Sequence, residues 1–265
     1  MPAIEKSADA GGLTYDTMMH NAGKRVAKWL MQNASTNIKR GVIGLVGSGN
    51  NGGDTLIALT ELARRGARTM AFLAKSRKSD PFIEDYLTTG GAVIDISSGA
   101  SLETFQAALQ SGVIILDGIL GTGLKLPIRG ELRDVMGGLR NMIINLPNVL
   151  RIAVDCPSGV DCDTGEASMV ALPANETLCM AAMKQGLLKH PARALAGNLH
   201  SIDIGLDAIS NHISKELPRM ITQEFVSSNL PKRPPTGHKG TFGTCLVIAG
   251  SDPFTGAAFL AGKGA

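Results

Sequence analysis

The chain has 265 residues, of which 44% are hydrophobic and 18% are charged, and its formal net charge is +3. These values are typical of a folded globular protein, and so mild a charge gives no indication of a nucleic-acid-binding surface. The apolar runs are shorter than the roughly 18 residues of a membrane helix, and the first residues, MPAIEKSADAGG, mix acids and bases, so the sequence predicts neither a membrane segment nor a secretory signal.

The cysteines of the chain show no C-x-x-C spacing, and this spacing is typical of zinc and redox motifs. We therefore expect reduced and mostly buried thiols, and a cytoplasmic location for the protein. The residues concerned are Cys156, Cys162, Cys179 and Cys245.

From the N-terminus onward, residues 14–34 have apolar side chains at helical spacing and predict an amphipathic helix. The predicted apolar face of this helix consists of Met18, Ala22, Val26, Trp29 and Leu30. After it, short apolar runs alternate with helical segments. The runs predicted as strands are 42–46, 69–74, 92–96, 113–117, 149–155, 176–183 and 198–205. The helices predicted between them cover 54–65, 81–91, 101–110 and a stretch that ends near 145.

Short, continuously apolar strands that alternate with helices predict a mostly parallel sheet covered on both faces. The fold class is therefore α/β, with three layers in the order helix, sheet, helix. Between residues 214 and 240 the composition changes, and the segment NLPKRPPTGHKG is typical of a linker. The last residues, 241–265, predict a strand, a turn and the start of a helix, which cannot bury their own apolar faces.

The segment VGSGNNGGD joins the first predicted strand to the next predicted helix. Gly47, Gly49 and Gly52 satisfy the G-x-G-x-x-G pattern, which in this position favours a dinucleotide phosphate at the helix N-terminus. The same glycines could serve only a tight turn. A Walker A loop is excluded, because Gly53 and Asp54 stand where that motif requires Lys and Ser or Thr.

The end of the second predicted strand lacks the acidic residue that commonly binds the ribose of NAD. Basic side chains follow this strand instead, and they could accept the 2′-phosphate of NADP or form a solvated loop. These side chains are Lys75, Arg77 and Lys78.

Two further predicted strands end in loops rich in oxygen-bearing side chains. Asp117 ends one strand in LDGILGTGL, and Asp155 ends the next in VDCPSGVDCDTG, which also holds Ser158. Each aspartate could instead cap a helix or form a turn. Because parallel strands present their carboxyl ends at one edge, oxygens of Asn51, Asp117 and Ser158 could surround a hard cation. The single carboxylate among them favours a monovalent ion over Mg²⁺, and Asp155 is left free for chemistry.

Four motifs occur in a characteristic order, namely GSGNNGGD, LDGILGTGL, VDCPSGVDCDTG and SIDIG. With them, residues 3–210 resemble the NAD(P)HX epimerase family, also called the YjeF N-terminal domain, whose sheet is Rossmann-like. The segment GHKGTFGTCLVIAGSDPFTGAAFLA resembles the opening of the ADP-dependent NAD(P)HX dehydratase domain, which has a ribokinase-like fold. The resemblance implies an epimerase domain over 1–214, a linker over 215–240 and the start of a dehydratase domain over 241–265.

The resemblance also implies roles for individual residues. A potassium ion, one per subunit, would be bound by Asn51, Asp117 and Ser158. Lys184 matches a lysine of the family, for which a catalytic role and a salt-bridged structural role are both open. The hydrated nucleotide would contact Asn50, Asn51, Gly52, Gly53, Asp54, Gly121, Thr122, Gly123, Leu124, Lys125, Leu126, Pro127 and Asp155.

One departure from the family pattern follows the NNGGD motif. Thr55 stands where the family usually has glycine. A hydroxyl at this position could cap the helix N-terminus, so we expect the change to be tolerated.

The activity implied is epimerisation of the R and S forms of hydrated NADH and NADPH, in the repair of nicotinamide nucleotides. Asp155 is the expected catalytic residue, because inversion through a cationic intermediate needs a carboxylate and a proton shuttle. A homodimer or higher homo-oligomer is expected, without nucleic acid or membrane as a partner. Two alternatives stay open: a non-catalytic nucleotide-binding or scaffold module of the same family, and an ordinary NADP-dependent dehydrogenase with a catalytic His, Tyr or Lys.

The ADP- or ATP-binding site and the catalytic aspartate of a ribokinase-like dehydratase are expected beyond residue 265. We therefore predict that the 265-residue chain alone does not dehydrate NADHX. The measurement is the absorbance of NADH after the purified chain is incubated with NADHX and ADP. Formation of NADH that depends on ADP would contradict this prediction.

Overall fold

The structure is a computed structural model, and it describes residues 6, 8–77, 79–97, 102–109, 113–146, 148–206, 218, 220–238 and 240–265. The chain divides into two compact units, residues 1–213 and residues 214–265. The boundary predicted after residue 214 falls within 207–217, which lie outside the described residues. The three predicted domain ranges therefore stay predictions.

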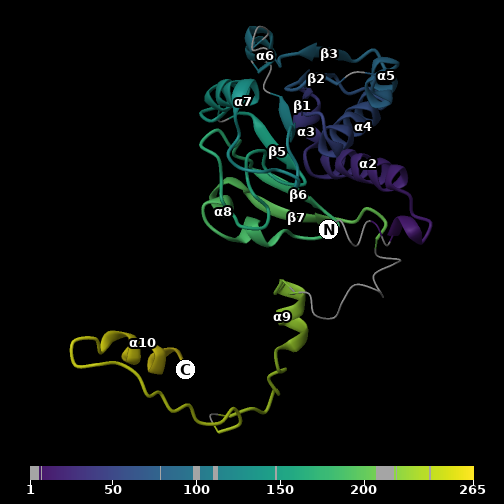
Figure 1. Cartoon of the computed structure of the whole chain (residues 1–265). Coiled ribbons are helices and arrows are strands. Elements are labelled where there is room, and N and C mark those ends of the chain that lie inside the picture. The colour runs from purple at the N-terminus through teal and green to yellow at the C-terminus, as the bar shows by residue number, and fades with distance from the viewer. Residues whose placement is uncertain are drawn as a thin grey trace. The chain divides into compact units, whose positions relative to one another are not determined.

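The first unit is built on seven parallel strands in the order β3-β2-β1-β4-β5-β6-β7 (Figure 1). The whole lengths of β1 and β4 are buried, which requires cover on both faces of the sheet. The predicted α/β fold with a parallel sheet is confirmed. The strands are β1 (Val42–Val46), β2 (Thr69–Leu73), β3 (Ala92–Asp95), β4 (Ile114–Gly118), β5 (Leu150–Val154), β6 (Glu176–Met180) and β7 (Asn198–Ile202).

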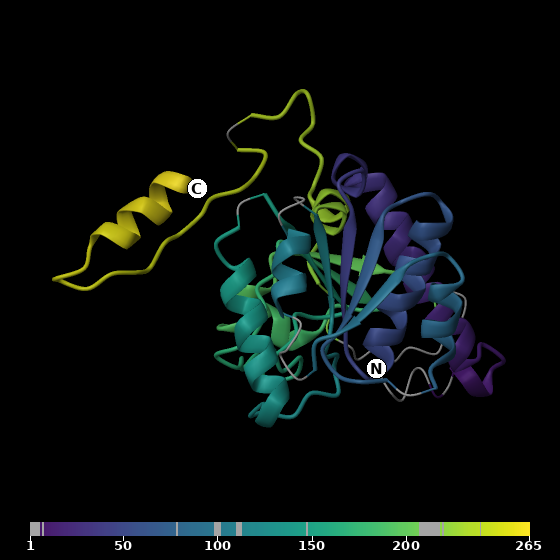
Figure 2. The ribbon, with the colours of Figure 1, turned by 90° about the horizontal axis from the view of Figure 1, so that it is seen from above.

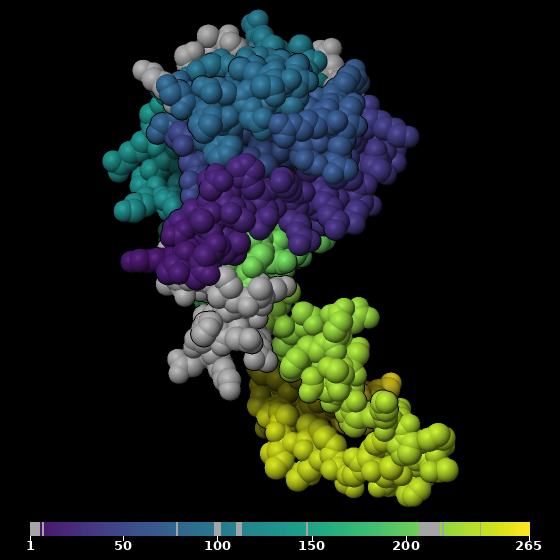
Figure 3. All heavy atoms as spheres, turned by 90° about the vertical axis from the view of Figure 1, so that its right-hand side faces the viewer, coloured from purple at the N-terminus to yellow at the C-terminus, as the bar shows by residue number. Residues whose placement is uncertain are grey.

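Helices cover the sheet on both sides, as the view from above shows (Figure 2). One face packs against α2 (Tyr15–Asn33), α4 (Asn50–Arg64) and α5 (Pro81–Leu87). The other face packs against α6 (Leu102–Leu109) and α7 (Gly130–Ile143). Figure 3 shows the first of these sides, where the purple atoms of α2 adjoin the blue atoms of α4 and α5. The shorter helices of this unit are α3 (Ser35–Ile38), η1 (Gln185–Leu188) and α8 (Ala192–Leu195).

The order of the strands creates a switch point between β1 and β4. The helix that follows β1 is α4, on one face, and the helix that follows β4 is α7, on the opposite face. The two connections therefore leave the carboxyl edge of the sheet in opposite directions. In open α/β sheets this divergence opens the crevice where ligands bind.

The helix α4 begins at Asn50, four residues before the position that the sequence predicts. The NNGGD segment is thus the first turn of the helix, not a loop. The turn requires glycine, because a Cβ at Gly52 would lie only 2.1 Å from the carbonyl oxygen of Gly47 and 2.7 Å from Arg77 Nη1. Glycine lowers intrinsic helix propensity, but here it allows the helix to approach the preceding loop.

The second unit contains α9 (Gln223–Asn229) and α10 (Gly256–Gly264). The strand predicted after residue 241 is wrong, since the structure forms only an isolated bridge between Ser251 and Phe254 there. Helix α9 lies inside the predicted linker. A strand needs a neighbouring strand for its backbone hydrogen bonds, and the described residues of this unit provide none. Helices of the described chain are all too short or too polar to cross a membrane.

The contact between Gly118 and Thr55 offers a test of this packing. A Cβ at Gly118 would lie 1.9 Å from Thr55 Oγ1 and 2.9 Å from Thr55 Cβ. We expect Gly118→Ala to lower the free energy of unfolding by about 1–3 kcal/mol through overpacking. Thr55→Gly should recover part of this loss in the double variant, so a double-mutant cycle by urea unfolding should show favourable coupling.

A matched control is Gly137→Ala in α7. The Cβ added there would meet Val170 Cγ1 at an ordinary 3.5 Å, so little loss of stability is expected. If the changes in unfolding free energy caused by Gly118→Ala and Thr55→Gly simply add in the double variant, the proposed contact between these two positions is wrong.

Candidate active site

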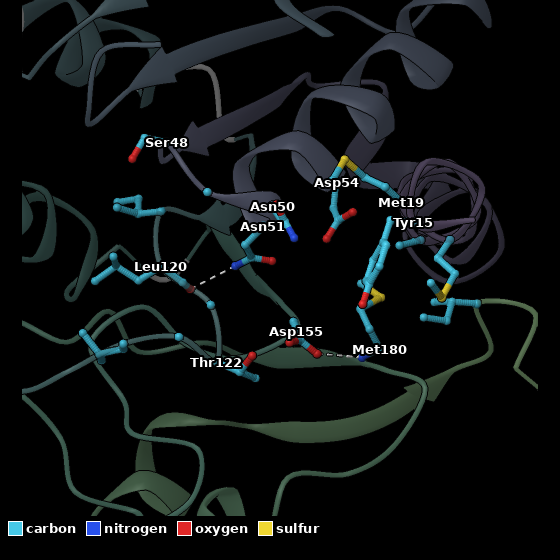
Figure 4. A pocket seen from close by; sticks show the side chains of 18 residues that line it. Tyr15, Met19, Ser48, Asn50, Asn51, Asp54, Leu120, Thr122, Asp155 and Met180 are labelled. Carbon is cyan, nitrogen blue, oxygen red and sulfur yellow. Dashed lines mark hydrogen bonds between the residues drawn. The ribbon is translucent and has the colours of Figure 1, made fainter. Parts of the chain in front are cut away.

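A cavity of about 530 Å³ lies at the carboxyl edge of the sheet, at the β1/β4 switch point (Figure 4). It is lined by the first turn of α4, the loop after β4 and the residue that follows β5. The structure thus brings three separate predicted segments to one cavity. The predicted residues that line it are Asn50, Asn51, Asp54, Gly121, Thr122, Gly123, Leu124 and Asp155.

The other predicted site residues lie outside the lining of this cavity. Gly52 packs on the Gly47 carbonyl, and a Cβ at Gly53 would meet the sulfur of Met19 at 2.9 Å. Both glycines therefore allow close packing behind the wall. The remaining predicted residues outside the lining are Lys125, Leu126, Pro127, Asp117, Ser158 and Lys184.

Sequence reasoning missed the part of the cavity wall that lies between Asp54 and Asp155 in Figure 4. Tyr15, Met18 and Met19 reach it from α2, and Met180 and Ile204 reach it from the ends of β6 and β7. Tyr15 is 47% exposed, and its ring lies beside Asp54 in Figure 4. Only the apolar spacing of α2 pointed to a buried face there, and it gave no sign that part of this face borders a cavity.

Arg77 fixes the loop after β1 and is not free to bind a 2′-phosphate. Its Nη1 donates to the carbonyl oxygens of Gly47 at 2.6 Å and Gly49 at 2.8 Å, and its Nε forms an ion pair with Asp80. The side chain is 9% exposed. The sequence-based alternative of a 2′-phosphate site is wrong for Arg77, and Lys78 lies outside the described residues.

A buried polar network joins the three loops behind the cavity. The Ser158 hydroxyl donates to Asp117 Oδ1 at 2.5 Å, and the Ser158 N–H donates to Asp117 Oδ2 at 2.8 Å. The N–H of Leu120 donates to the same hydroxyl at 2.8 Å, and Asn51 Nδ2 donates to the Leu120 carbonyl at 2.9 Å. Asn51, Asp117 and Ser158 thus meet around one residue of the β4 loop.

This network has the features of a cation site. Asn51 Oδ1 is buried and has no hydrogen-bond partner, and Asp117 forms no ion pair with any described residue. Burying a carboxylate without a counter-charge, or an amide oxygen without a donor, is costly. In the described residues no cluster of three or more His, Cys, Asp or Glu side chains exists, so the donor set is one carboxylate with neutral oxygens. That set suits a hard monovalent ion, as the sequence predicts.

Asp155 is held in a strained and well-defined position. Its φ angle is +66°, in the left-handed region that aspartate tolerates better than most residues. Its Oδ1 accepts a hydrogen bond from the Met180 N–H at 2.9 Å and forms an ion pair with Lys184. Its Oδ2 accepts no hydrogen bond from any described residue, so this oxygen is available to a ligand in the cavity.

Lys184 lies behind Asp155 and remains charged. Burial lowers the pKa of Lys184, but the charge and hydrogen bond of Asp155 outweigh this effect and raise the pKa above its ordinary value. Its Nζ also donates to the Met180 carbonyl at 2.8 Å. A charged lysine with these partners orients the carboxylate and has no lone pair to act as a base.

The thiols near this ion pair are neutral. A hydrogen bond with Cys162 and burial raise the pKa of Cys156, and burial raises the pKa of Cys179 to about 12. Such thiols are inert as nucleophiles. The prediction of mostly buried cysteines is confirmed, because Cys156, Cys162 and Cys179 are buried and Cys245 is exposed.

Thr55 does not cap the helix as the sequence suggested. Its Oγ1 donates to the Asn51 carbonyl at 2.9 Å, one turn back within α4, and the residue is fully buried. The helix N-cap is Gly49, which has no side chain to accept a hydrogen bond. The N–H groups of Gly52 and Gly53 donate to the Gly49 carbonyl, so those of Asn50 and Asn51 remain for a ligand at the rim of the cavity.

Comparison with known proteins identifies the family. The model of the family "YjeF-related protein N-terminus" matches residues 15–186. The chain belongs to this YjeF-related family. The matched range contains every predicted site residue, and every residue that lines the cavity of this YjeF-related domain except Ile204.

Proteins with related sequences carry two names. A bifunctional NAD(P)H-hydrate repair enzyme Nnr from Moorella thermoacetica is 33% identical over 94% of this chain and 47% of its own length. An NAD(P)H-hydrate epimerase from Clavibacter michiganensis is 38% identical over 63% of this chain and 73% of its own length. The chain thus spans about half the length of the bifunctional relatives.

A solved structure shares the fold of this YjeF-related chain. The crystal structure of yeast ynu0, YNL200c, has a TM-score of 0.60 and 19% sequence identity, and it covers 91% of this chain and 94% of its own. This likeness supports the fold class.

The pKa of Asp117 in this YjeF-related domain predicts a pH-dependent stability. Burial raises the pKa of Asp117 to about 6, and hydrogen bonds from Ser158 and Ile119 oppose the rise only in part. The folded state then binds the proton more tightly than the unfolded chain. The stabilisation from protonated Asp117 is complete below about pH 4 and is lost as the pH rises through about 6.

We compare the unfolding free energy of the wild-type protein with that of Asp117→Asn. We expect the wild-type value, after subtraction of the variant's value, to fall by about 2–3 kcal/mol between pH 4 and pH 7. Urea unfolding in potassium-free buffer measures this difference. Potassium chloride should reduce the fall compared with the sodium salt, because a bound cation favours the ionised carboxylate. If the difference in unfolding free energy between the wild type and Asp117→Asn does not change with pH, the raised pKa of Asp117 is wrong.

Proposed function

We propose that this chain epimerises the R and S forms of hydrated NADH and NADPH in nicotinamide nucleotide repair. The observation that carries the proposal is the Asp155 carboxylate, which exposes one oxygen to a cavity at the sheet's switch point. The names of the relatives, NAD(P)H-hydrate epimerase and bifunctional NAD(P)H-hydrate repair enzyme, support the same substrate class.

The reaction must invert C6 of the hydrated nicotinamide ring. The C6 hydroxyl takes up a proton and leaves as water with the help of the N1 lone pair, and a cationic iminium forms. Water then adds to the opposite face of the ring. A carboxylate beside the ring stabilises the cation and can transfer the proton, which is the role that we propose for Asp155.

We propose that Lys184 is a positioning residue for Asp155. Its ammonium and the Met180 N–H both contact Oδ1, which leaves Oδ2 for the proposed substrate. Lys184 is 7% exposed and is not part of the cavity lining. Of the two roles that the sequence left open, the salt-bridged role is the one these contacts support.

We propose that Asn51, Asp117 and Ser158 hold a potassium ion, one per subunit. Their oxygens lie on three chain segments that meet at Leu120, which is part of the cavity wall. When bound, the ion would neutralise Asp117 and hold these segments together. The nucleotide phosphates would be bound by backbone N–H groups of the α4 N-terminus and of the glycine loop at 121–123.

Other predictions extend beyond this unit. ADP or ATP is proposed only for a dehydratase domain that residues 241–265 would begin, and in the longer protein that domain would dehydrate S-NAD(P)HX. A homodimer or higher homo-oligomer, a cytoplasmic location and the absence of nucleic-acid and membrane partners stay predictions.

Replacement of Asp155 tests the proposed activity. We expect Asp155→Asn to lower kcat for epimerisation by about 10²–10⁴-fold, because the proton transfer is lost while the side-chain shape is kept. Chiral separation or NMR of R- and S-NADHX measures the rate against a sample without enzyme, and binding is measured in parallel. The control is Asp134→Asn, which changes an exposed carboxylate on α7.

We expect the control to match the wild-type rate. Wild-type chain that binds NADHX without accelerating epimerisation would favour the non-catalytic module instead. Full activity of Asp155→Asn would refute the assignment of the residue.

A further inference from the structure

The cavity carries a second carboxylate on the wall opposite Asp155. Asp54 lies in the first turn of α4, whereas Asp155 follows β5 at the edge of the sheet. Figure 4 shows both side chains directed into the cavity from different sides, with Tyr15 and Met180 along the wall between them. A planar ring placed between these walls would have one carboxylate near each of its faces.

This arrangement matters because epimerisation uses both faces of one carbon. The oxygen that leaves C6 departs on one side of the ring, and the oxygen that adds arrives on the other side. A single carboxylate can reach only one face of a held ring within hydrogen-bond distance. With one acid or base on each face, neither the ring nor a side chain has to turn over during the reaction.

We propose that Asp54 is the second catalytic acid–base residue, serving the ring face opposite Asp155. This inference rests on the proposed epimerase function and assigns Asp54 a role beyond contact with the nucleotide. Met18, Met180 and Ile204 supply apolar surface in the same cavity. That surface holds the ring in place and limits access of bulk water to the cation.

The step is balanced without any oxidant or reductant. A protonated carboxyl on one face gives its proton to the C6 hydroxyl, the C6–O bond breaks, and one water leaves with the bonding electron pair. The N1 lone pair forms the N1=C6 bond of the iminium. On the other face a solvent water bonds to C6, the N1=C6 pair returns to N1, and the second carboxylate takes the proton. One proton has then moved from one carboxyl to the other.

The two directions of the reaction therefore need opposite protonation forms. The form with Asp54 protonated acts on the epimer whose hydroxyl faces Asp54, and the form with Asp155 protonated acts on the other epimer. Each carboxyl can also release and return water on its own face without inversion. Oxygen exchange and inversion are thus separable, and this difference provides the test.

The experiment uses purified R-NADHX and S-NADHX with the 265-residue chain in ¹⁸O-labelled water. Wild-type chain should label both epimers as it interconverts them. We expect Asp54→Asn to slow epimerisation by about 100-fold or more, while Asp155 still exchanges the oxygen of one epimer without inversion. Asp155→Asn should give the mirror result, with exchange confined to the other epimer. Asp134→Asn is the matched control and should behave as wild type.

Asp54→Ser provides a second variant that cannot transfer a proton, and thermal unfolding of both variants verifies that they fold. Epimerisation by a folded Asp54 variant at the wild-type rate overturns the inference. So does loss of exchange from both epimers, because Asp54 would then be needed for binding or for both faces alike. If the wild-type chain does not epimerise NADHX at all, the proposed function itself fails, whatever the Asp54 variants show.

Discussion

The parallel pairing of β1 with β4 is the constraint on which the site depends. The register places Val46 beside Gly118, so the two following loops start side by side before they diverge to opposite faces. The approach is close enough that a Cβ at Gly47 would lie 1.7 Å from the Ile119 carbonyl oxygen. This proximity lets the Asn51 amide reach the Leu120 carbonyl, and the same loop then joins the proposed cation site to the wall of the cavity.

Much of the scaffold could be predicted from the sequence because its signals are local. The apolar runs of β1 and β4 and the amphipathic spacing of α2 each reflect burial of neighbouring residues in the chain. The predicted start of α4 is wrong because intrinsic propensity disfavours a helical NNGGD turn. Glycine is needed there instead for close approach to distant residues, since a Cβ at Gly52 would meet Arg77 Nη1 at 2.7 Å and one at Gly53 would meet Met19 at 2.9 Å.

The rest of the site could not be predicted because its contacts join distant segments. Tyr15 and Ile204 border one cavity although 189 residues separate them, and no local pattern marks such a meeting. The sequence predicts that Arg77 could bind a phosphate, but its guanidinium donates to the carbonyls of the loop after β1, which no local pattern indicates. The strand expected after residue 241 is absent although its local sequence pattern is suitable. A β-strand also needs a neighbouring strand, which the described residues of the second unit do not provide.

The charges around the cavity explain why one monovalent cation suits the proposed reaction. When ionised, Asp54, Asp117 and Asp155 carry three negative charges, and Lys184 carries one positive charge. A monovalent ion beside Asp117 leaves these groups with a net charge of −1, which balances the single positive charge of the iminium. A divalent ion would leave the iminium as an uncompensated charge in a partly buried site, where Coulomb interactions are stronger than in water. With a monovalent ion, the proposed cation site would neutralise Asp117 and still leave the net negative charge that the proposed iminium needs beside Asp54 and Asp155.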